Sequence, residues 1–332
     1  MRHALLSLLV VACRSPAAPP RQPDPTRIEL AAGDLTFTGM CDASGAVLLG
    51  PKAFAVADDE DGILRIYDLE RGGPPTATFD ISAAVIPEAL RDQIAASDEI
   101  DTEGAARIGN VAFWISSHSR RKNGDAAPAR FRLFSTTTPA HDEPIRVLGT
   151  TTLLLAAISA EPTLARIAAA AALSPVAGGI NIEGLSQRAE GGLWIGFRSP
   201  VIHGKAVLLG LVNPNEMIAG APAKLVGPVL LPLGGRGIRA MTRHRGRYLL
   251  VAGDPSHARR SVVYVWDGTT AREIAGLDLT QFNAEAFVAD EARARVMVLS
   301  DDGSVVIDGI ECKSSAPAKK RFHGRWISIP GR

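Results

Sequence analysis

Charged residues recur at fixed spacing along this chain, and their types suit the binding of a cation beside an anion. Each of five repeats opens on a charged residue just before a strand-like segment; these residues are Asp42, Glu103, Glu183, Arg239 and Glu285. Fifteen positions further on, four repeats reach a short polar cluster, and the first repeat reaches one a position later. The charged members of these clusters that we single out are Asp58, His118, Arg198, Asp254 and Asp301. In an antiparallel hairpin the start of one strand lies beside the end of the next, so both sets should gather on one face.

Carboxylates that converge on one face could hold a hard cation such as calcium through oxygen ligands, and we expect Glu103, Glu183 and Glu285 to supply them. On the anion side, His118, Arg120 and Arg198 could hold a phosphate or a carboxylate. Together these groups would permit metal-assisted hydrolysis of a phosphoester, with the three glutamates and His118 as catalytic candidates. The alternative is structural, because a carboxylate at the head of a strand also accepts backbone N–H groups and ties neighbouring sheets together.

The elements that position these residues are predicted to be short strands, four to each repeat. In the fourth repeat they cover residues 238–242, 248–252, 262–266 and 271–274, with Asp267-Gly268 as a tight turn. Four antiparallel strands repeated around a ring are typical of a β-propeller, so we expect an all-β fold with five four-stranded blades. Six blades would require the long repeats to be split. We expect residues 303–308 and 325–329 to complete the fifth blade, and residues 27–30 to pair on an outer edge.

Two insertions and the N-terminal region depart from the repeat. Residues 83–97 and 151–173 have the apolar spacing of helices, so we expect two short helical insertions in a propeller domain that spans residues 28–332. They would form either a cap packed on the rim or a lid over the site. Residues 1–13 resemble an export signal that ends in a bacterial lipobox at Cys13, and residues 14–27 form a proline-rich tether. These features predict a lipid-anchored protein of the bacterial envelope or periplasm.

Lipidation of Cys13 would leave two cysteines, Cys41 in the first repeat and Cys312 in the last. First and last repeats are neighbours in a closed ring, so a disulfide across the seam is expected, and the compartment would allow it. Two separate buried thiols are the alternative.

The overall composition and net charge limit which kinds of partner the protein could bind. The chain of 332 residues is 46% hydrophobic and carries a net charge of +1, so no long-range field favours nucleic acid. We expect contact with a membrane only through the N-terminal lipid, and a monomeric protein.

Several segments also resemble a known bacterial family, domain of unknown function 3616, over roughly residues 38–325. The segments are Cys41-Asp-Ala-Ser44, Ala57-Asp-Asp-Glu-Asp61, Ile115-Ser-Ser-His-Ser-Arg120, Asn181-Ile-Glu-Gly-Leu185, Ile195-Gly-Phe-Arg-Ser-Pro200, Gly235-Arg-Gly-Ile-Arg239 and Phe282-Asn-Ala-Glu-Ala286. This resemblance implies the fold and no settled activity. More distantly, the Glu-Gly strand heads are similar to those of esterase-like phytases, which implies a phosphoester or calcium-linked role.

The sequence therefore predicts an exported propeller that binds a small or envelope ligand on the face lined by strand-head acids, arginine and histidine. One alternative is a calcium-dependent, phytase-like phosphoesterase. A second is an envelope scaffold that docks protein partners through its helical insertions.

Overall fold

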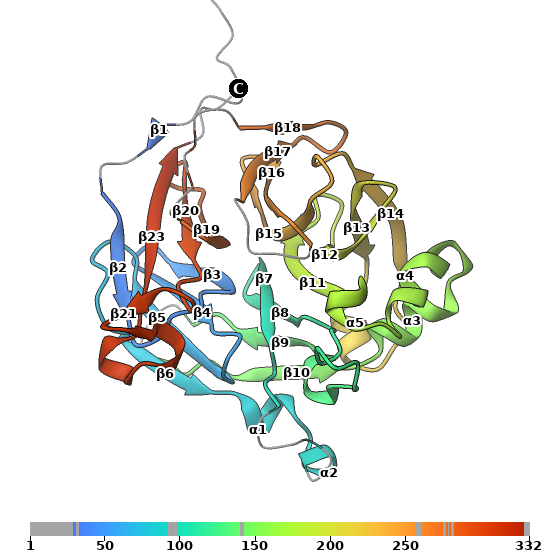
Figure 1. The fold of residues 1–332 in the computed structure, drawn as a ribbon, viewed down its shortest axis with the longest axis horizontal. Helices are drawn as coiled ribbons and strands as arrows, with labels where there is room; N and C mark the ends of the chain where they lie inside the picture. The colour runs from blue at the N-terminus through green and yellow to red at the C-terminus, as the bar shows by residue number, and fades with distance from the viewer. Residues whose placement is uncertain are drawn as a thin grey trace, which may run out of the picture.

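The strands of the protein form five antiparallel sheets arranged around a central axis, as the computed structural model shows (Figure 1). The structure describes residues 29–30, 33–91, 94, 98–139, 143–255, 261–274, 277, 279 and 282–328. The five-bladed propeller predicted from the repeats is confirmed, and the described residues contain no sixth blade. The N-terminal segment with Cys13 and the proline-rich tether lie outside the described residues, so lipidation stays a prediction.

Four blades are built from consecutive strands, which follow one another from the channel outward. The first blade contains β3 (Gly45–Gly50), β4 (Ala53–Ala57), β5 (Ile63–Asp68) and β6 (Ala77–Asp80). The second contains β7 (Thr102–Ile108), β8 (Val111–Ser116), β9 (Leu133–Thr137) and β10 (Val147–Thr151). The third contains β11 (Asn181–Gln187), β12 (Leu193–Ile202), β13 (Lys205–Leu211) and β14 (Leu225–Leu231). The fourth contains β15 (Gly237–His244), β16 (Arg247–Gly253), β17 (Val262–Trp266) and β18 (Ala271–Glu273).

Runs of apolar residues form the strands, and residues that favour tight turns end them. β17 is almost continuously apolar, because neighbouring blades cover both faces of its sheet, and four of its five residues are buried. The predicted turn after it is present: the Asp267 carboxylate accepts hydrogen bonds from the N–H groups of Thr269 and Thr270, at 2.9 and 2.8 Å. Gly268 has a φ of +98°, a conformation that favours glycine.

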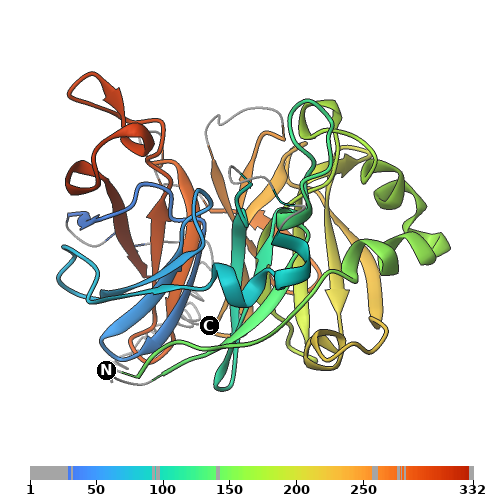
Figure 2. The same ribbon diagram turned by 90° about the horizontal axis from the view of Figure 1, so that it is seen from below.

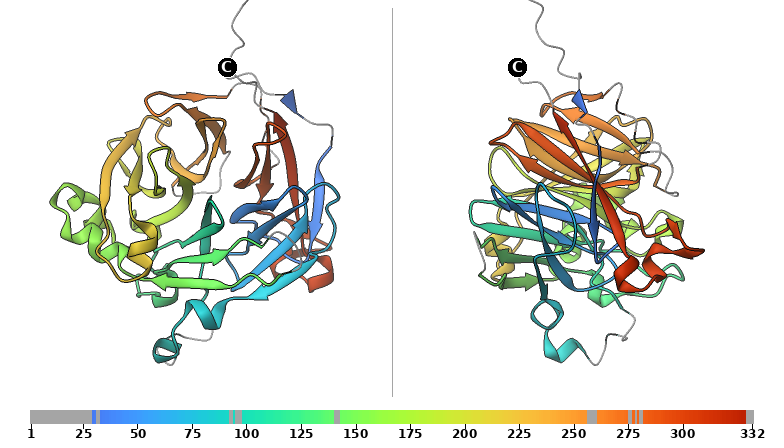
Figure 3. Two further views of the ribbon diagram at one scale, coloured as in Figure 1. Left: turned by 180° about the vertical axis from the view of Figure 1, so that it is seen from behind. Right: turned by 90° about the vertical axis from the view of Figure 1, so that its left-hand side faces the viewer.

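The fifth blade draws on both ends of the described chain. β19 (Ala284–Asp290), β20 (Arg295–Ser300) and β23 (Arg321–Ser328) form its inner part. The outer edge of β23 pairs with β2 (Leu35–Thr38) and β1 (Glu29–Leu30), and Figure 3 shows these strands in one sheet. The predicted outer pairing of residues 27–30 is thus confirmed for Glu29 and Leu30.

The prediction that residues 303–308 complete this blade is wrong. Within that segment β21 (Val306–Ile307) pairs instead with β22 (Ile310–Glu311) in a separate hairpin. Burial explains the difference: Phe37 of β2 is fully buried and stacks on Phe322 with ring centroids 5.0 Å apart, whereas Val306 is 64% exposed. The edge of β23 therefore pairs with β2, whose Phe37 adds an aromatic ring to the core of the blade.

A disulfide joins Cys41 to Cys312 across the seam between the first and last blades, as predicted. Both residues are buried, and Ile307 packs against them. The two ends of the ring are thus held by strand pairing and by a covalent bond.

The helical insertions also lie where they were predicted. The first contains α1 (Ser82–Val85) and α2 (Glu88–Arg91); residues 92–93 and 95–97 lie outside the described part. The second contains α3 (Leu154–Ala160) and α4 (Ala165–Ala170), and Figure 2 shows them at the side of the third blade. Leu154, Ile158 and Ile167 pack into the core of that blade, which is the arrangement of a rim cap. Sequence patterns did not indicate α5 (Pro214–Ile218). Within the described chain no helix has the length and apolar character that crossing a membrane requires.

Candidate functional site

Four of the five strand-head residues sit in a distortion of their strand that turns the side chain toward the channel. The pairing register between first and second strands shifts at Thr102/Gly104, Ile182/Gly184, Ile238/Ala240 and Ala284/Ala286. Such a β-bulge places two residues opposite one and re-aims the side chain of the extra residue. The charged residue of each repeat occupies that position. The common spacing in the sequence therefore records a common bulge.

Glycine after two of the glutamates lets the inner strands come close together. A Cβ atom on Gly104 would lie 3.0 Å from the Cβ of Leu185 on the next blade, and one on Gly184 would lie 2.8 Å from Ile238. The Glu-Gly pairs thus serve packing around the axis as well as charge.

The side chains aimed by the bulges enclose a cavity of about 620 Å³ at one mouth of the channel. Its floor holds the strand-head residues Glu103, Glu183, Arg239 and Glu285, all at least nine-tenths buried. Asn181 at the start of β11 and Arg198 within β12 also line the cavity. The segments between strands contribute Asp59, Asp101, Arg130 and Asp301. Arg120, Arg121 and Lys122 line its rim. The cavity thus has an acidic floor crossed by arginines, and a basic rim.

Arg239, the arginine that stands where the other repeats have an acid, links three blades. Its guanidinium pairs with Glu285 of the fifth blade and lies 3.5 Å from Glu183 of the third. It also donates a hydrogen bond of 2.6 Å to the side-chain oxygen of Asn283. Although burial opposes its charge, Glu285 and Glu183 hold its pKa above the usual arginine range. This residue therefore completes the acidic ring rather than interrupting it.

Glu183 has a second cationic partner. Arg198 Nη1 donates to its Oε1 at 2.7 Å, and the Asn181 amide donates to the same oxygen at 2.8 Å. The Oε2 atoms of Glu183 and Glu285 are buried and accept no hydrogen bond from the described residues. Two carboxylate oxygens at the floor of the cavity thus have unused hydrogen-bonding capacity.

Among the glutamates at the floor of the cavity, Glu103 is the one whose negative charge is least balanced by nearby cations. It forms no ion pair with any described Lys, Arg or His residue, and burial raises its pKa well above the ordinary value. One of its oxygens lies within 4.8 Å of oxygens of Glu183 and Glu285. A second group of the same kind contains Glu103, Asp101 and Asp59. Glu103 is therefore common to two groups of carboxylates that could hold a cation.

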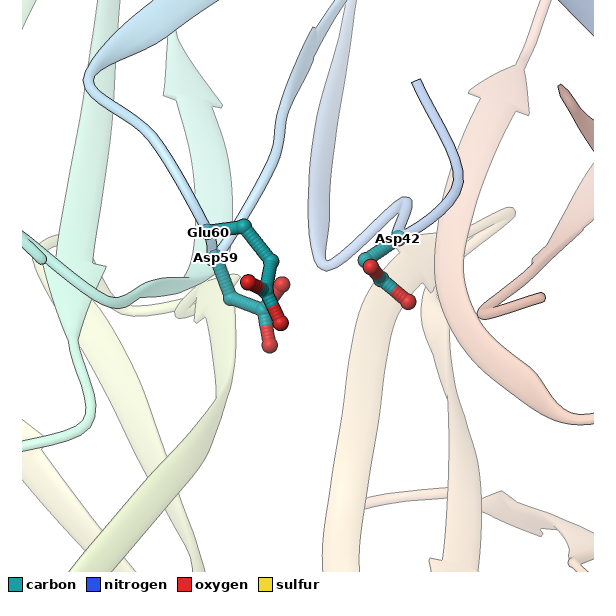
Figure 4. Close-up of side chains that lie close together, drawn as sticks. All are labelled: Asp42, Asp59 and Glu60. Atoms are coloured by element: carbon teal, nitrogen blue, oxygen red, sulfur yellow. The ribbon is translucent and has the colours of Figure 1, made fainter. Parts of the chain in front are cut away.

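A third acidic group lies at the seam of the ring. Figure 4 shows Asp59 and Glu60, from the loop after β4, beside Asp42 from the chain just before β3. One oxygen from each lies within 4.8 Å of the others. Asp42 pairs through its backbone with Asp301 of the fifth blade in an antiparallel bridge, and burial raises the pKa values of both carboxyl groups. This group extends the acidic floor toward the disulfide.

Three residues of the predicted second set do not line the cavity. Asp58 is buried, accepts a hydrogen bond from the N–H of Glu60 and lies 3.9 Å from Arg65. Asp254 contributes its carbonyl oxygen, which accepts a 3.4 Å hydrogen bond from Arg198. His118 is 2% exposed, and its Nδ1 lies 2.8 Å from the carbonyl oxygen of Ser116.

Burial lowers the pKa of His118 to about 4, so the imidazole is neutral at physiological pH. The structure therefore brings together Arg198, Asp301 and four strand heads, with Arg120 at the rim, whereas His118 and the strand head Asp42 do not line the cavity.

Sequence reasoning missed Asp101, Asn181 and Asn283, which lie two positions before the glutamates. Asp101 accepts a hydrogen bond from Ser117 and pairs with Arg130 at 3.2 Å. Asn283 donates to Asp301 at 2.8 Å while it accepts from Arg239. A repeated Asp/Asn-x-Glu pattern, present as Asp101-Thr-Glu103, Asn181-Ile-Glu183 and Asn283-Ala-Glu285, is the signal that could have found them.

Burial of acids makes the folded protein bind protons. It raises the pKa values of Asp58, Glu285 and Asp301 to about 7. The folded state then retains protons that the unfolded state loses near pH 4. The stability that these three acids contribute is therefore fully present below pH 4 and is lost as the pH rises through about 7. The buried histidines His118 and His244, whose pKa values are lowered, oppose this change but are fewer.

We therefore expect the metal-free protein to be at least about 2 kcal/mol less stable at neutral pH than at about pH 5, since each acid contributes up to about 1.4 kcal/mol per pH unit and the two histidines offset part of the sum. Urea unfolding in the presence of a chelator measures this difference. A denaturation midpoint that rises over the same interval would contradict the assignment of these acids as protonated.

Comparison with known proteins supports the resemblance drawn from the sequence. The family model described as Protein of unknown function (DUF3616) matches residues 134–288, which confirms that resemblance over this segment. None of the curated proteins matches this sequence.

Among solved structures, the glutaminyl cyclase of Myxococcus xanthus is 12% identical, with 91% of this chain and 97% of that chain covered and a TM-score of 0.49. The exo-beta-1,3-galactanase of Phanerochaete chrysosporium is 10% identical, with 90% and 63% covered and a TM-score of 0.46. A putative oxidoreductase (glucose dehydrogenase) of Thermus thermophilus is 11% identical, with 90% and 99% covered and a TM-score of 0.43. Likenesses at this level assign no residue of the site.

Proposed function

We propose that this propeller, whose residues 134–288 match the DUF3616 family, binds calcium and a small anionic ligand together at the acidic mouth of its channel. The observation that carries the proposal is Glu103: a buried carboxylate, shared by two groups of acids, for which the described chain supplies no cation. A buried carboxylate without a partner is costly. Either a proton or a bound cation must neutralise it.

The charge balance of the floor favours a divalent ion. The two groups that share Glu103 contain five carboxylates: Asp59, Asp101, Glu103, Glu183 and Glu285. Three arginines pair with them: Arg130, Arg198 and Arg239. With all groups ionised, five negative and three positive charges leave a charge of −2, which one divalent cation would neutralise.

The spacing of the oxygens suits calcium. Calcium binds oxygen at about 2.3–2.6 Å, so two ligands on opposite sides of one ion are about 5 Å apart. In each group one oxygen from every residue lies within 4.8 Å of the others, close enough for all three to ligate one ion. Magnesium, at about 2.1 Å, would require a more compact and more regular set of ligands.

The basic rim supports the anionic part of the ligand. Arg120 is held toward the cavity by hydrogen bonds from Nε to the carbonyl oxygen of Ala171 (2.9 Å) and from Nη1 to that of Gly124 (3.0 Å). Lys122 is exposed beside it. An anion that also ligates the calcium ion would meet these cations at the rim.

Calcium should stabilise the full-length protein, because an ion that binds only the folded state raises its stability. We expect about 1 mM calcium to raise Tm at neutral pH by about 2–4 °C, if Kd is about 0.1 mM. In Glu103→Gln the calcium-dependent shift should disappear, while Tm without calcium stays equal or rises, since glutamine mimics the protonated acid. Differential scanning fluorimetry with chelated and calcium-loaded samples measures both quantities.

Asp58→Asn is the matched control. Asp58 is an equally buried acid on the same face that does not line the cavity, so this variant should keep the calcium shift. An unchanged wild-type Tm in calcium, or an equal shift in Glu103→Gln, would refute the site. The anion is then sought with inorganic phosphate and citrate, each of which should raise Tm further only when calcium is present.

The hydrolase alternative gains no support from His118, because its imidazole lies outside the cavity. The predicted export fits the calcium proposal, since the Cys41–Cys312 disulfide is suited to an oxidising compartment. Sites in extracellular modules commonly bind calcium at about 0.1–1 mM.

A further inference from the structure

The opposite mouth of the channel holds a second and larger cavity, of about 900 Å³. The same inner strands build it: positions four residues after the strand heads Glu103, Glu183 and Arg239 carry Arg107, Gln187 and Arg243. The register that gathers acids at one mouth therefore gathers basic and amide groups at the other.

An apolar layer lies between this ring and the middle of the channel. It is formed two residues after the strand heads, by Ala105, Leu185 and Phe287. Leu185 and Phe287 also line the narrow waist between the two mouths, where free space is only about 10 Å³. The second cavity thus ends in an apolar floor and does not continue into the acidic site.

Of the three arginines that line this cavity, Arg107 and Arg243 have no carboxylate partner among the described residues, whereas Arg293 has one. Arg107 is fixed across the blade boundary by Nη1, which donates to the carbonyl oxygens of Leu48 and Leu49 at 2.7 and 3.0 Å. Arg243 is half-buried, and its Nε is buried without a hydrogen-bond partner among the described residues. In the same part of the chain neither arginine forms an ion pair.

The two acids that line this cavity, Asp290 and Glu291, already contact other groups of the protein. Asp290 pairs with Arg293 at 2.9 Å and with Arg295 at 3.3 Å. Glu291 accepts the backbone N–H of Arg245 at 2.8 Å and lies 3.4 Å from His244. The cavity therefore offers unpaired positive charge above an apolar floor.

We propose that this second mouth binds a small organic anion with an apolar tail, a medium-chain carboxylate, with its head group on Arg107 and Arg243 and its tail toward Leu185 and Phe287. Charge complementarity selects the head group, because a guanidinium without an ion pair attracts a carboxylate and can donate hydrogen bonds to it. The apolar layer selects the tail. This inference is independent of the calcium site, from which the waist separates it.

Titration of the full-length protein with octanoate, followed by calorimetry, tests the proposal. We expect saturable binding to the wild type, at least tenfold weaker binding to Arg243→Gln, and no binding of octylammonium, which has the same tail and the opposite charge. The buried Nε of Arg243 makes no hydrogen bond within the described chain that would hold the fold, so the variant should remain folded. Arg247→Gln is the control, since Arg247 lies on the same hairpin but does not line the cavity, and it should bind octanoate like the wild type.

Three outcomes would overturn the inference: no octanoate binding, equal binding of octylammonium, or equal losses in Arg243→Gln and Arg247→Gln. Binding to phosphatidylglycerol vesicles without binding of free octanoate would also reject a free carboxylate as the ligand. Glu103→Gln separates the two mouths, because it should lose the calcium response while binding octanoate normally. Failure of one site would then leave the other intact.

Discussion

Replacement of Arg239 by methionine is expected to lower the free energy of unfolding by about 3–5 kcal/mol at neutral pH. In this variant Glu183 and Glu285, which are 2% and 5% exposed, would lose the cationic partner that they share inside the channel. Removing one member of a buried ion pair costs much more than the pair contributes, because the remaining charge stays desolvated. Urea unfolding of both proteins measures the difference.

The pH dependence of this loss identifies its cause. Without Arg239 the pKa values of both glutamates should rise further, so that the variant regains stability as the acids take up protons. The difference from the wild type should therefore be smaller at about pH 5 than at about pH 8. Adding Glu183→Gln and Glu285→Gln to Arg239→Met should recover part of the loss. A loss that is independent of pH and unaffected by the glutamine substitutions would mean that Arg239 contributes packing rather than charge.

Loss of the Cys41–Cys312 disulfide should have an effect of similar size. The bond closes a loop with a sequence separation of 271 residues, and the chain-entropy model assigns such a loop about 5 kcal/mol. We expect the Cys41→Ser, Cys312→Ser double variant to unfold at a correspondingly lower urea concentration, and reductant to lower the stability of the wild type to the same level.

The double variant is its own control against reductant, which should not affect its stability further. Equal stability of the oxidised wild type and the double variant would contradict the prediction. Because Asp42 follows Cys41 directly, the calcium response of the double variant also reports whether the seam positions the acidic floor.

The repeat was enough to predict the blades and the mouth of the channel, because four of the five strand heads sit in a bulge at the same position of their repeat. Glu103, Glu183 and Glu285 gather as expected for that reason. The same logic is blind to loops: within Asp58-Asp59 the first carboxylate points into the blade and the second into the cavity, and spacing alone does not separate neighbours.

The outermost strand of the fifth blade could not be found by scanning each repeat separately. β2 and β23 lie at opposite ends of the described chain, and nothing local marks Leu35–Thr38 as the partner of Arg321–Ser328. Arg239 shows a related limit. The sequence shows an arginine where the other repeats have an acid, but its pairing with Glu183 and Glu285 across three blades is visible only in three dimensions.

The shared fifth blade has a consequence for biosynthesis. During synthesis the chain emerges from its N-terminal side, so β2 is made long before its partner β23 exists. Until then Phe37 of β2 lacks its stacking partner Phe322 and the edge of β2 is unpaired, and such edges invite association with other chains. Pairing over so long a sequence separation is also slow. The nascent ring would therefore depend on holdase chaperones until its last strand is translated.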